Sequence, residues 1–111
     1  MNRPIVYLAC PYSHELPSYR EARFHAANQA AAKLMAQGVV VFSPISHAHP
    51  IALAGDLPKG WEFWERYDRA VLSCCCKVVV LRLPGWEKST GVRAEIKIAE
   101  EMGIPVEYME P

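Results

Sequence analysis

The sequence has 111 residues, of which 51% are hydrophobic, and this is enough to bury the core of one domain but not of two. Twelve basic and twelve acidic side chains cancel to a formal net charge of zero. Neither sign forms a run, so the composition argues against nucleic-acid polymers and membrane surfaces as partners. We therefore expect a single domain over residues 1–111 that binds a small molecule.

The first half of the chain predicts two strands with a helix between them. Ile5 to Ala9 is an apolar run rich in β-forming residues, and Val39 to Phe42 repeats the pattern. Between them lies an alanine-dense helical stretch, Ser18 to Gln37, which Gly38 closes. Runs that are apolar at every position indicate strands covered on both faces.

The second half predicts two further helices, each followed by a strand. The helices are expected at Pro58 to Ser73 and at Thr90 to Met102, and the strands at Val78 to Leu83 and at Pro105 to Tyr108. The connection before them, Ser43 to Lys59, is longer than a compact α/β domain needs, so we interpret it as a binding loop.

Strands that alternate with helices predict an α/β fold with right-handed crossovers. We expect a flavodoxin- or Rossmann-like three-layer sandwich with a mostly parallel sheet of four to five strands. Ligands of such sheets bind at the carboxyl ends of the strands. Here those ends are residues 10–13, 43–50 and 84–89.

The sequence also favours a cytoplasmic location. The apolar run from Ile5 to Cys10 is far shorter than a membrane span and lacks the layout of a signal peptide. Cys74, Cys75 and Cys76 are consecutive and lead into an apolar strand, whereas disulfide frameworks spread their cysteines through loops. We expect reduced, packed thiols.

One carboxylate, Glu95, interrupts the apolar stripe of the last predicted helix. At ~100° per residue, that stripe gathers Val92, Ile96, Ala99 and Gly103. Burying an unpaired carboxylate costs several kcal/mol, so Glu95 needs a partner, a proton or a function. One explanation is a structural acid near the helix N-terminus, stabilised by the dipole and by an arginine such as Arg93 or Arg20.

The preceding helix repeats this anomaly, since Asp68 lies four residues from both Trp64 and Leu72 on an apolar face. If both acids approach the same crevice, they form a carboxylate pair suited to substitution at the anomeric carbon of a sugar. One carboxylate attacks that carbon, while the other, kept protonated by apolar surroundings, assists the leaving group. The alternative for Asp68 is an ion pair with Arg66 or Arg69.

Three small residues at the start of the last helix, Ser89, Thr90 and Gly91, offer hydroxyls and free backbone N–H groups at a positive helix end. This arrangement suits a phosphate, and it equally suits ordinary N-capping.

Histidine and tryptophan side chains are the remaining candidates for contacts with a ligand. His47 and His49 form an H-x-H pattern that can reach one metal ion from an extended loop. The sequence offers no clear third ligand, so we expect no metal and interpret His47 as a contact for a base, the alternative being histidines that pack beneath Pro50. The helical spacing of Trp61 and Trp64 indicates core packing, whereas Trp86, in a strand-end loop, is the better candidate for the pocket.

Several motifs resemble one known family. Ser89 to Glu95, read as S-x-G-V-x-x-E between a strand and a helix, resembles the nucleophile motif of the nucleoside 2-deoxyribosyltransferase superfamily, most closely its branch of nucleoside 5′-monophosphate N-glycosidases. Val6 to Cys10 is similar to the first strand of that superfamily. More narrowly, LACPYSH, FSPISHAHPI and LPGW-x-x-S-x-G look like a small family of bacterial and phage proteins assigned to it.

The resemblance implies roles for individual residues. Glu95 would be the nucleophile and Tyr7 its orienting partner. Asp68 would be the acid that interacts with the sugar or base, and Ser89 a phosphate ligand. The transferases usually carry an acid where Ser89 stands and a threonine where Val92 stands, so this chain favours a monophosphorylated substrate. No cofactor is implied, and superfamily members form homodimers or higher homo-oligomers, which we expect here.

Two departures from the family pattern affect the substrate. The phosphate-binding glycosidases place a serine and an arginine in the first loop, where this chain has Pro11 and Ser13. Basic residues for the phosphate are then expected from elsewhere, the candidates being Arg20, Arg82 and Lys88. At the C-terminus, the transferases project polar residues into a neighbouring subunit's site, whereas this chain has Tyr108-Met-Glu-Pro111, so water is the expected acceptor.

The expected function is cleavage of the base–sugar bond of a nucleoside or (deoxy)nucleoside 5′-monophosphate through a covalent glycosyl-Glu95 intermediate. The alternatives are base exchange by a nucleoside 2-deoxyribosyltransferase and a non-catalytic nucleotide sensor in which Glu95 only contacts ribose hydroxyls. The remaining substrate-binding residues are expected to be Cys10, Pro11, Ser13, Gly91, His47 and Trp86.

Overall fold

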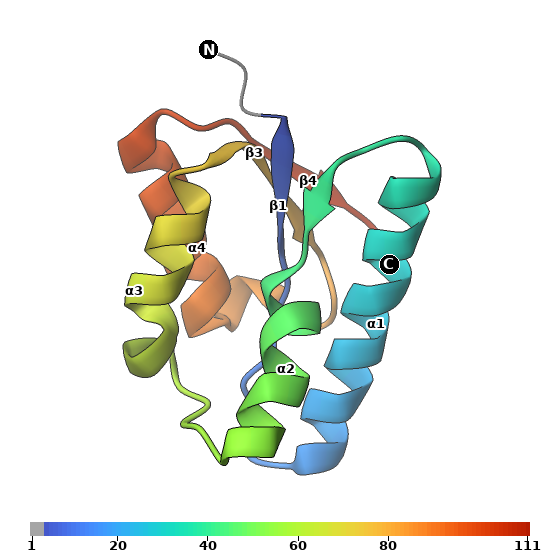
Figure 1. The fold of residues 1–111 in the computed structure, drawn as a ribbon, viewed down its shortest axis with the longest axis vertical. Helices are drawn as coiled ribbons and strands as arrows, with labels where there is room; N and C mark the ends of the chain where they lie inside the picture. The colour runs from blue at the N-terminus through green and yellow to red at the C-terminus, as the bar shows by residue number, and fades with distance from the viewer. Residues whose placement is uncertain (1–3) are drawn as a thin grey trace.

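Four strands form a sheet in the order β2-β1-β3-β4, and every neighbouring pair is parallel. The computed structural model describes residues 4–111, so the first three residues of the expected domain lie outside the described part. The strands are β1 Ile5–Ala9, β2 Val41–Phe42, β3 Cys75–Leu81 and β4 Val106–Met109. With helices on both faces of the sheet (Figure 1), the predicted α/β class and Rossmann-like sandwich are confirmed.

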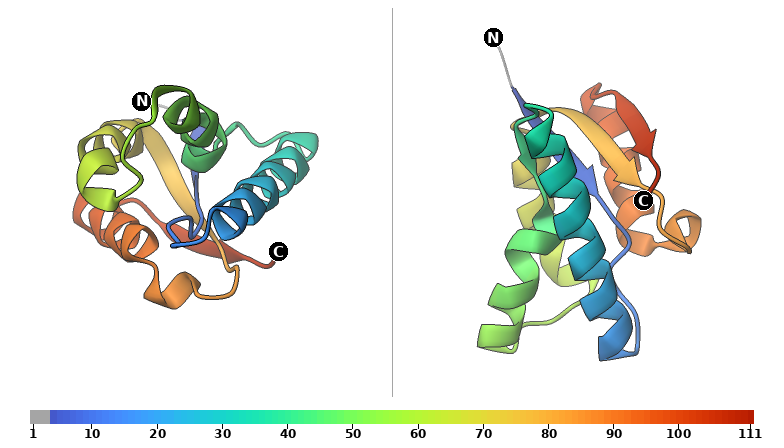
Figure 2. Two further views of the ribbon diagram at one scale, coloured as in Figure 1. Left: turned by 90° about the horizontal axis from the view of Figure 1, so that it is seen from below. Right: turned by 90° about the vertical axis from the view of Figure 1, so that its right-hand side faces the viewer.

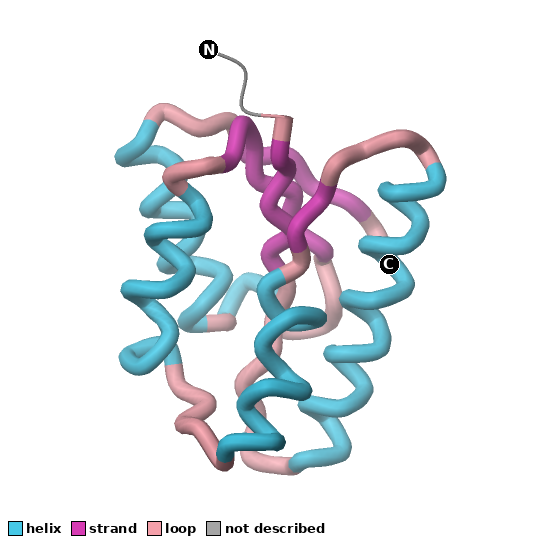
Figure 3. Tube along the Cα trace, in the orientation of Figure 1, coloured by secondary structure: helices cyan, strands magenta, loops and turns pink. Residues whose placement is uncertain are grey.

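The helices are α1 Pro17–Ala36, α2 Pro44–Gly55, α3 Trp61–Leu72, the short 3-10 helix η1 Trp86–Lys88, and α4 Thr90–Met102. Three of them were predicted, with α4 at the expected bounds and α1 and α3 shifted by one to three residues at their ends. The expected loop over residues 43–59 was wrong, because most of this segment is α2 (Figure 3).

Local capping explains why α2 forms despite its prolines. Ser43 accepts a hydrogen bond from the backbone N–H of Ser46, which is a helix N-cap. Pro44 occupies the first turn, where its fixed φ suits a helix and its missing N–H costs nothing. Pro50 lies inside the helix and removes one backbone hydrogen bond, and the helix ends at Asp56 in the left-handed conformation.

The two faces of the sheet carry separate cores. Val6 and Leu8 of β1 pack toward α1, whose buried alanines, Ala27, Ala30 and Ala31, let the helix approach closely. Tyr7 and Ala9 point to the opposite face, which α3 and α4 cover. Figure 2 shows the sheet between α1 on one side and α3 and α4 on the other. Because successive side chains of a strand point to opposite faces, Tyr7 lies on the side of the sheet that α4 covers.

The strand order reverses between β1 and β3. From β1 the chain passes through α1 to β2 at one edge, then returns across β1 to β3 and continues to β4 at the other edge. In sheets of this kind the crevice beyond the carboxyl ends of the two strands at the reversal is the usual ligand site.

The cysteines are only partly as expected. All four are free thiols, and Cys10 and Cys75 are buried, but Cys74 and Cys76 are exposed. The prediction of packed thiols was therefore wrong for these two residues. Among the helices of residues 4–111, none is both long and apolar enough to cross a membrane.

Candidate functional site

A cavity of about 350 Å³ opens beyond the carboxyl ends of β1 and β3. The walls come from the end of β1 with the loop that follows it, one side of α2, α3 as far as Asp68 with the loop before it, and the N-terminal turns of α4. Its size lies within the range of pockets for small molecules. The cavity thus occupies the place that the topology favours.

Both anomalous carboxylates, Glu95 and Asp68, line this cavity. Their side chains are buried, with 6% and 9% of their surface exposed. Tyr7, which is completely buried, donates a hydrogen bond from its hydroxyl to Oε2 of Glu95. The predicted partnership of Tyr7 and Glu95 is therefore present in the structure, and Asp68 shares their cavity.

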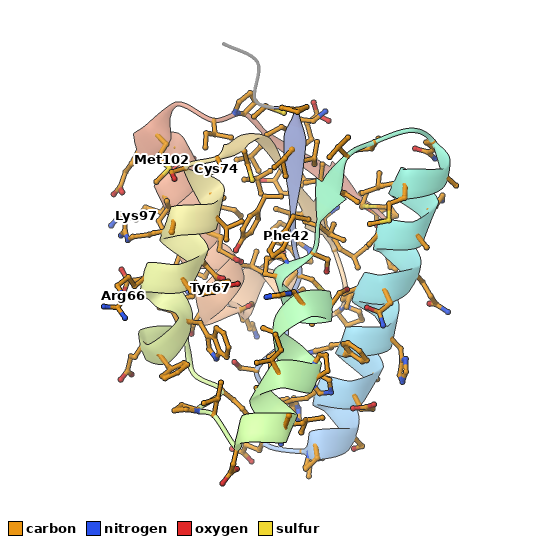
Figure 4. The ribbon with its side chains drawn as sticks, viewed as in Figure 1. Phe42, Arg66, Tyr67, Cys74, Lys97 and Met102 are labelled. Atoms are coloured by element: carbon orange, nitrogen blue, oxygen red, sulfur yellow. The ribbon has the colours of Figure 1, made fainter. Side chains whose placement is uncertain are left out.

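The ion pairs proposed as alternatives for the two acids are absent from residues 4–111, where neither carboxylate contacts a basic side chain. Arg66 projects outward from α3 (Figure 4), and Arg69 pairs with Glu65 and Glu101. Because no cation compensates their burial, the two acids are driven toward their protonated forms.

The pKa values follow this environment. Burial raises the pKa of Glu95 to about 8, against the opposing effect of the hydrogen bond from Tyr7 and with a further contribution from the charge of Asp68. Burial likewise raises the pKa of Asp68 to about 6, and interaction with the Tyr7 hydroxyl opposes it. Between about pH 6 and pH 8 the pair holds one proton, which these values place on Glu95 while Asp68 is ionised.

The start of α4 forms the next part of the wall. Ser89, Thr90 and Gly91 all line the cavity, and Ser89 also caps α4 by accepting a hydrogen bond from the backbone N–H of Val92. The N-capping interpretation therefore holds, and the O–H of Ser89 is left as a donor. A methyl group at Gly91 would lie 3.9 Å from the ring of Trp61, which places Gly91 opposite an aromatic wall.

The structure reverses the expected roles of the tryptophans. Trp61 and Trp64 line the cavity, although Trp61 also packs against the core beneath α4. Trp86 lies outside the cavity lining and packs against that core and against Tyr108, at 5.5 Å between ring centroids. Helical spacing showed that the first two share a face, but not that the face borders a cavity.

The structure places the other histidine, His49 instead of His47, in the cavity wall. His47 lies outside the cavity lining, where its Nε2 is 3.0 Å from the hydroxyl of Tyr67. His49 lines the cavity instead and is 5% exposed. Both lie on α2 rather than on an extended loop, so the geometry assumed for a shared metal ion is wrong. Residues 4–111 contain no group of three or more ligands able to hold a metal ion.

The loop after β1 is only partly in the site. Cys10 and Ser13 line the cavity. Pro11 is fully buried and is not part of the lining. Burial, with the charge of Glu95, raises the pKa of the Cys10 thiol to about 12, although Arg23 opposes this. Cys10 is therefore an uncharged wall of the cavity and not a nucleophile.

None of the three basic residues expected to bind phosphate lines the cavity. Arg20 donates to backbone carbonyls of residues 14 and 15, and Arg82 pairs with Glu110. Lys88, in η1, is likewise outside the lining, and the basic residue that does line the cavity is Lys59. Sequence reasoning missed Lys59 and Tyr12, although Tyr12 belongs to the same strand-end loop as Cys10 and Ser13.

The raised pKa of Glu95 predicts that this residue weakens the fold at alkaline pH. A carboxyl whose pKa is higher in the folded than in the unfolded chain favours the folded state at low pH. That contribution is lost as pH rises from about 4.5 through about 8. Glu95→Gln removes this penalty and keeps an acceptor for Tyr7. We expect its melting temperature to exceed that of the wild type by about 5 °C or more at pH 8.5.

Thermal unfolding at pH 5 and at pH 8.5 measures this effect. At pH 5 the two proteins are expected to melt at similar temperatures. Glu100→Gln is the matched control, because Glu100 is an exposed carboxylate on the same helix. An equal effect of both substitutions, or no difference between the two pH values for Glu95→Gln, would contradict the buried, protonated state of Glu95.

Comparison with known proteins places the chain in a family. A family model described as "Domain of unknown function (DUF1937)" matches residues 4–111, which include all four strands and every side chain of the cavity. No curated protein matches the sequence. Because the family match extends over nearly the whole chain, the protein belongs to the DUF1937 family.

Proposed function

We propose that the protein is an N-glycosidase that cleaves the base–sugar bond of a nucleoside or (deoxy)nucleoside 5′-monophosphate. The observation that carries this proposal is the convergence of Glu95 and Asp68 on one cavity, with Glu95 hydrogen-bonded by Tyr7. Two carboxyl groups at one cavity, with one proton between them near neutral pH, are the equipment of retaining glycosidases. The resemblance to the nucleoside 2-deoxyribosyltransferase superfamily supports the same assignment of roles.

The proposed reaction has two steps. The reaction uses the form of the pair in which the one shared proton lies on Asp68 and Glu95 is ionised. Glu95 attacks C1′ while the C1′–N bond breaks, and the electron pair of that bond leaves with the base, which takes the proton from Asp68. Asp68, now ionised, then removes a proton from a water molecule, and the oxygen of this water attacks C1′. This second step releases the sugar with its original configuration and regenerates the Glu95 carboxylate.

The rest of the cavity supports a nucleotide as the ligand. Trp61 and Trp64 offer flat apolar surfaces for a base, and the O–H of Ser89 with the positive end of α4 suits a phosphate. Lys59 is the available cation at the cavity wall. We place Lys59, rather than the arginines suggested by the sequence, as the electrostatic partner of a 5′-phosphate.

One observation favours a second candidate function, a non-catalytic nucleotide sensor. A carboxyl with a pKa of about 8 carries a proton at neutral pH, and a protonated Glu95 is a poor nucleophile but a good hydrogen-bond donor to ribose hydroxyls. In this alternative the same cavity holds the nucleotide without cleaving it.

The location and assembly of the protein are part of the proposal. Free thiols, two of them exposed, suit a reducing compartment, and we propose that the protein is cytoplasmic. We also propose a homodimer or larger homo-oligomer, since large apolar side chains such as Met35, Val40 and Leu53 are more than half exposed.

A base-release assay tests the function. Purified protein is incubated with ribo- and deoxyribonucleosides and their 5′-monophosphates, and free base is measured by chromatography. We expect release by the wild type and a loss of at least about a thousandfold in Glu95→Gln, because the nucleophile is gone. Binding without release from any substrate would support the sensor. Release that persists in Glu95→Gln would contradict the assigned nucleophile.

The shared proton predicts a bell-shaped pH profile for kcat/KM. Below about pH 6 both carboxyls are protonated and the nucleophile is lost, and above about pH 8 both are ionised and the acid is lost. In Asp68→Asn the alkaline limb is expected to disappear, because that limb reports loss of the one proton that the pair shares and the variant has no such proton to lose, while the remaining activity is much lower. An unchanged alkaline limb would exclude Asp68 as the acid.

Gly91→Ala is expected to spare the fold and impair binding. The added methyl group makes only ordinary contact with Trp61, and alanine is favoured over glycine in a helix, so the melting temperature should be unchanged or higher. The methyl group narrows the cavity at the start of α4, and we expect KM for the preferred nucleotide to rise about tenfold. An unchanged KM would place the ligand elsewhere in the cavity.

A further inference from the structure

A second polar cluster meets the cavity on the side away from the carboxyl pair. The hydroxyl of Tyr12 lies 2.5 Å from Nδ1 of His49, and Nε2 of the same ring lies 2.7 Å from a carboxylate oxygen of Glu21. Tyr12 and His49 line the cavity, whereas Glu21 belongs to α1 and is 51% exposed. The proposed glycosidase chemistry uses none of these three residues.

The cluster holds the imidazole in one orientation. The ring of His49 is stacked on Phe24 of α1, at 4.4 Å between centroids, and meets the ring of Tyr12 edge-on. Hydrogen bonds at both ring nitrogens fix the rotation of the ring. The hydroxyl of Tyr12 therefore contacts an imidazole whose orientation Glu21 and Phe24 already fix.

The chain of hydrogen bonds sets the direction of the Tyr12 hydroxyl. An ionised carboxylate only accepts, so Nε2 of His49 must carry the hydrogen that it donates to Glu21. In the neutral imidazole, Nδ1 then has a lone pair and can only accept, so the O–H of Tyr12 donates to it. The oxygen of Tyr12 is left with lone pairs for a ligand.

We propose that Tyr12 is a specificity-determining residue that accepts a hydrogen bond from the amino group of a base, so that the cavity selects amino-bearing bases over their oxo counterparts. This inference rests on the proposed function, because it assumes a nucleotide in the cavity. A carbonyl oxygen at the same place would face the lone pairs of Tyr12 without a hydrogen between them, and the pair would lose a hydrogen bond.

The layout of the cavity assigns this contact to the base. The sugar must lie at Glu95 and Asp68 on the α3 and α4 side, and the wall formed by Tyr12 and His49 comes from the β1 loop and α2. Apolar residues of α2, including Ala48 and Ala52, and the two tryptophans also line the cavity, which suits the apolar faces of a base. The charges near Tyr12 have both signs, since Arg20 and Glu21 act on its hydroxyl in opposite directions, so the position of the sugar at the carboxyl pair is what assigns this wall to the base.

The test compares nucleotides that differ in this group and in the hydrogen on the neighbouring ring nitrogen. Binding of AMP and IMP, and of CMP and UMP, is measured by calorimetry on Glu95→Gln, which cannot consume them by the proposed route. For at least one pair we expect the amino-bearing nucleotide to bind about tenfold more tightly, the usual effect of one hydrogen bond made or lost in a buried site. Adding Tyr12→Phe should equalise that pair.

Glu21→Gln tests the chain of hydrogen bonds from outside the cavity. The glutamine amide can donate to Nε2 of His49, which allows Nδ1 to carry the hydrogen and to donate to Tyr12, whose O–H then turns toward the ligand. The preference is expected to shrink or to reverse toward the oxo base. His25→Gln is the matched control, because His25 contacts the other oxygen of Glu21 at 3.5 Å and should leave the preference unchanged.

The outcomes separate this inference from the proposed function. Equal binding within both pairs, or a preference that survives both Tyr12→Phe and Glu21→Gln, would overturn the inference even if the wild type releases bases. A preference that follows the predictions, without base release by the wild type, would establish the recognition and overturn the glycosidase. Absence of any nucleotide binding would overturn both.

Discussion

The hydrogen bond from Tyr7 to Glu95 joins the first strand to the last helix within the core, and the arrangement of the site depends on it. Tyr7 has no exposed surface and Glu95 has almost none. A carboxyl group in such surroundings without a donor would cost several kcal/mol. The tyrosine reduces that cost and fixes the carboxyl where the strand order reverses, beside the cavity that Asp68 reaches from α3. Precision at the site is therefore a consequence of core packing, because neither partner can turn away without leaving a buried polar group unpaired.

The two acids could be predicted from the sequence, whereas their tyrosine could not be predicted from spacing. A carboxylate among apolar residues at helical spacing is a conflict that is visible without coordinates, and Glu95 and Asp68 both stand in that position. Tyr7 lies in an apolar strand, where an aromatic residue is unremarkable, and only the resemblance pointed to it. The parallel fold was also predictable, because β1 and β3 are apolar on both faces and helices separate the strands.

The wall contributed by α2 was not predictable, for a physical reason. Two prolines and two histidines in residues 44–50 suggest irregular structure, and the cap at Ser43 is a short-range signal that competes with them. His49 is placed by Phe24 and Glu21, which lie more than twenty residues away on α1. Whether Trp61 and Trp64 face protein or empty space likewise depends on where α2 packs. These are tertiary effects that periodicity does not contain.

The half-exposed position of Glu21 has a consequence for how selectivity can change over time. Residues that touch a ligand are constrained by fit, packing and chemistry together, so most substitutions among them are costly. Glu21 touches solvent on one side and His49 on the other, and in the proposed recognition it stands three hydrogen bonds away from the base. An exchange at this surface position preserves the shape of the cavity and alters only the direction of a proton. If Tyr12 reads the base as proposed, preference among bases is open to adjustment from the outside of the molecule, with the interior left intact.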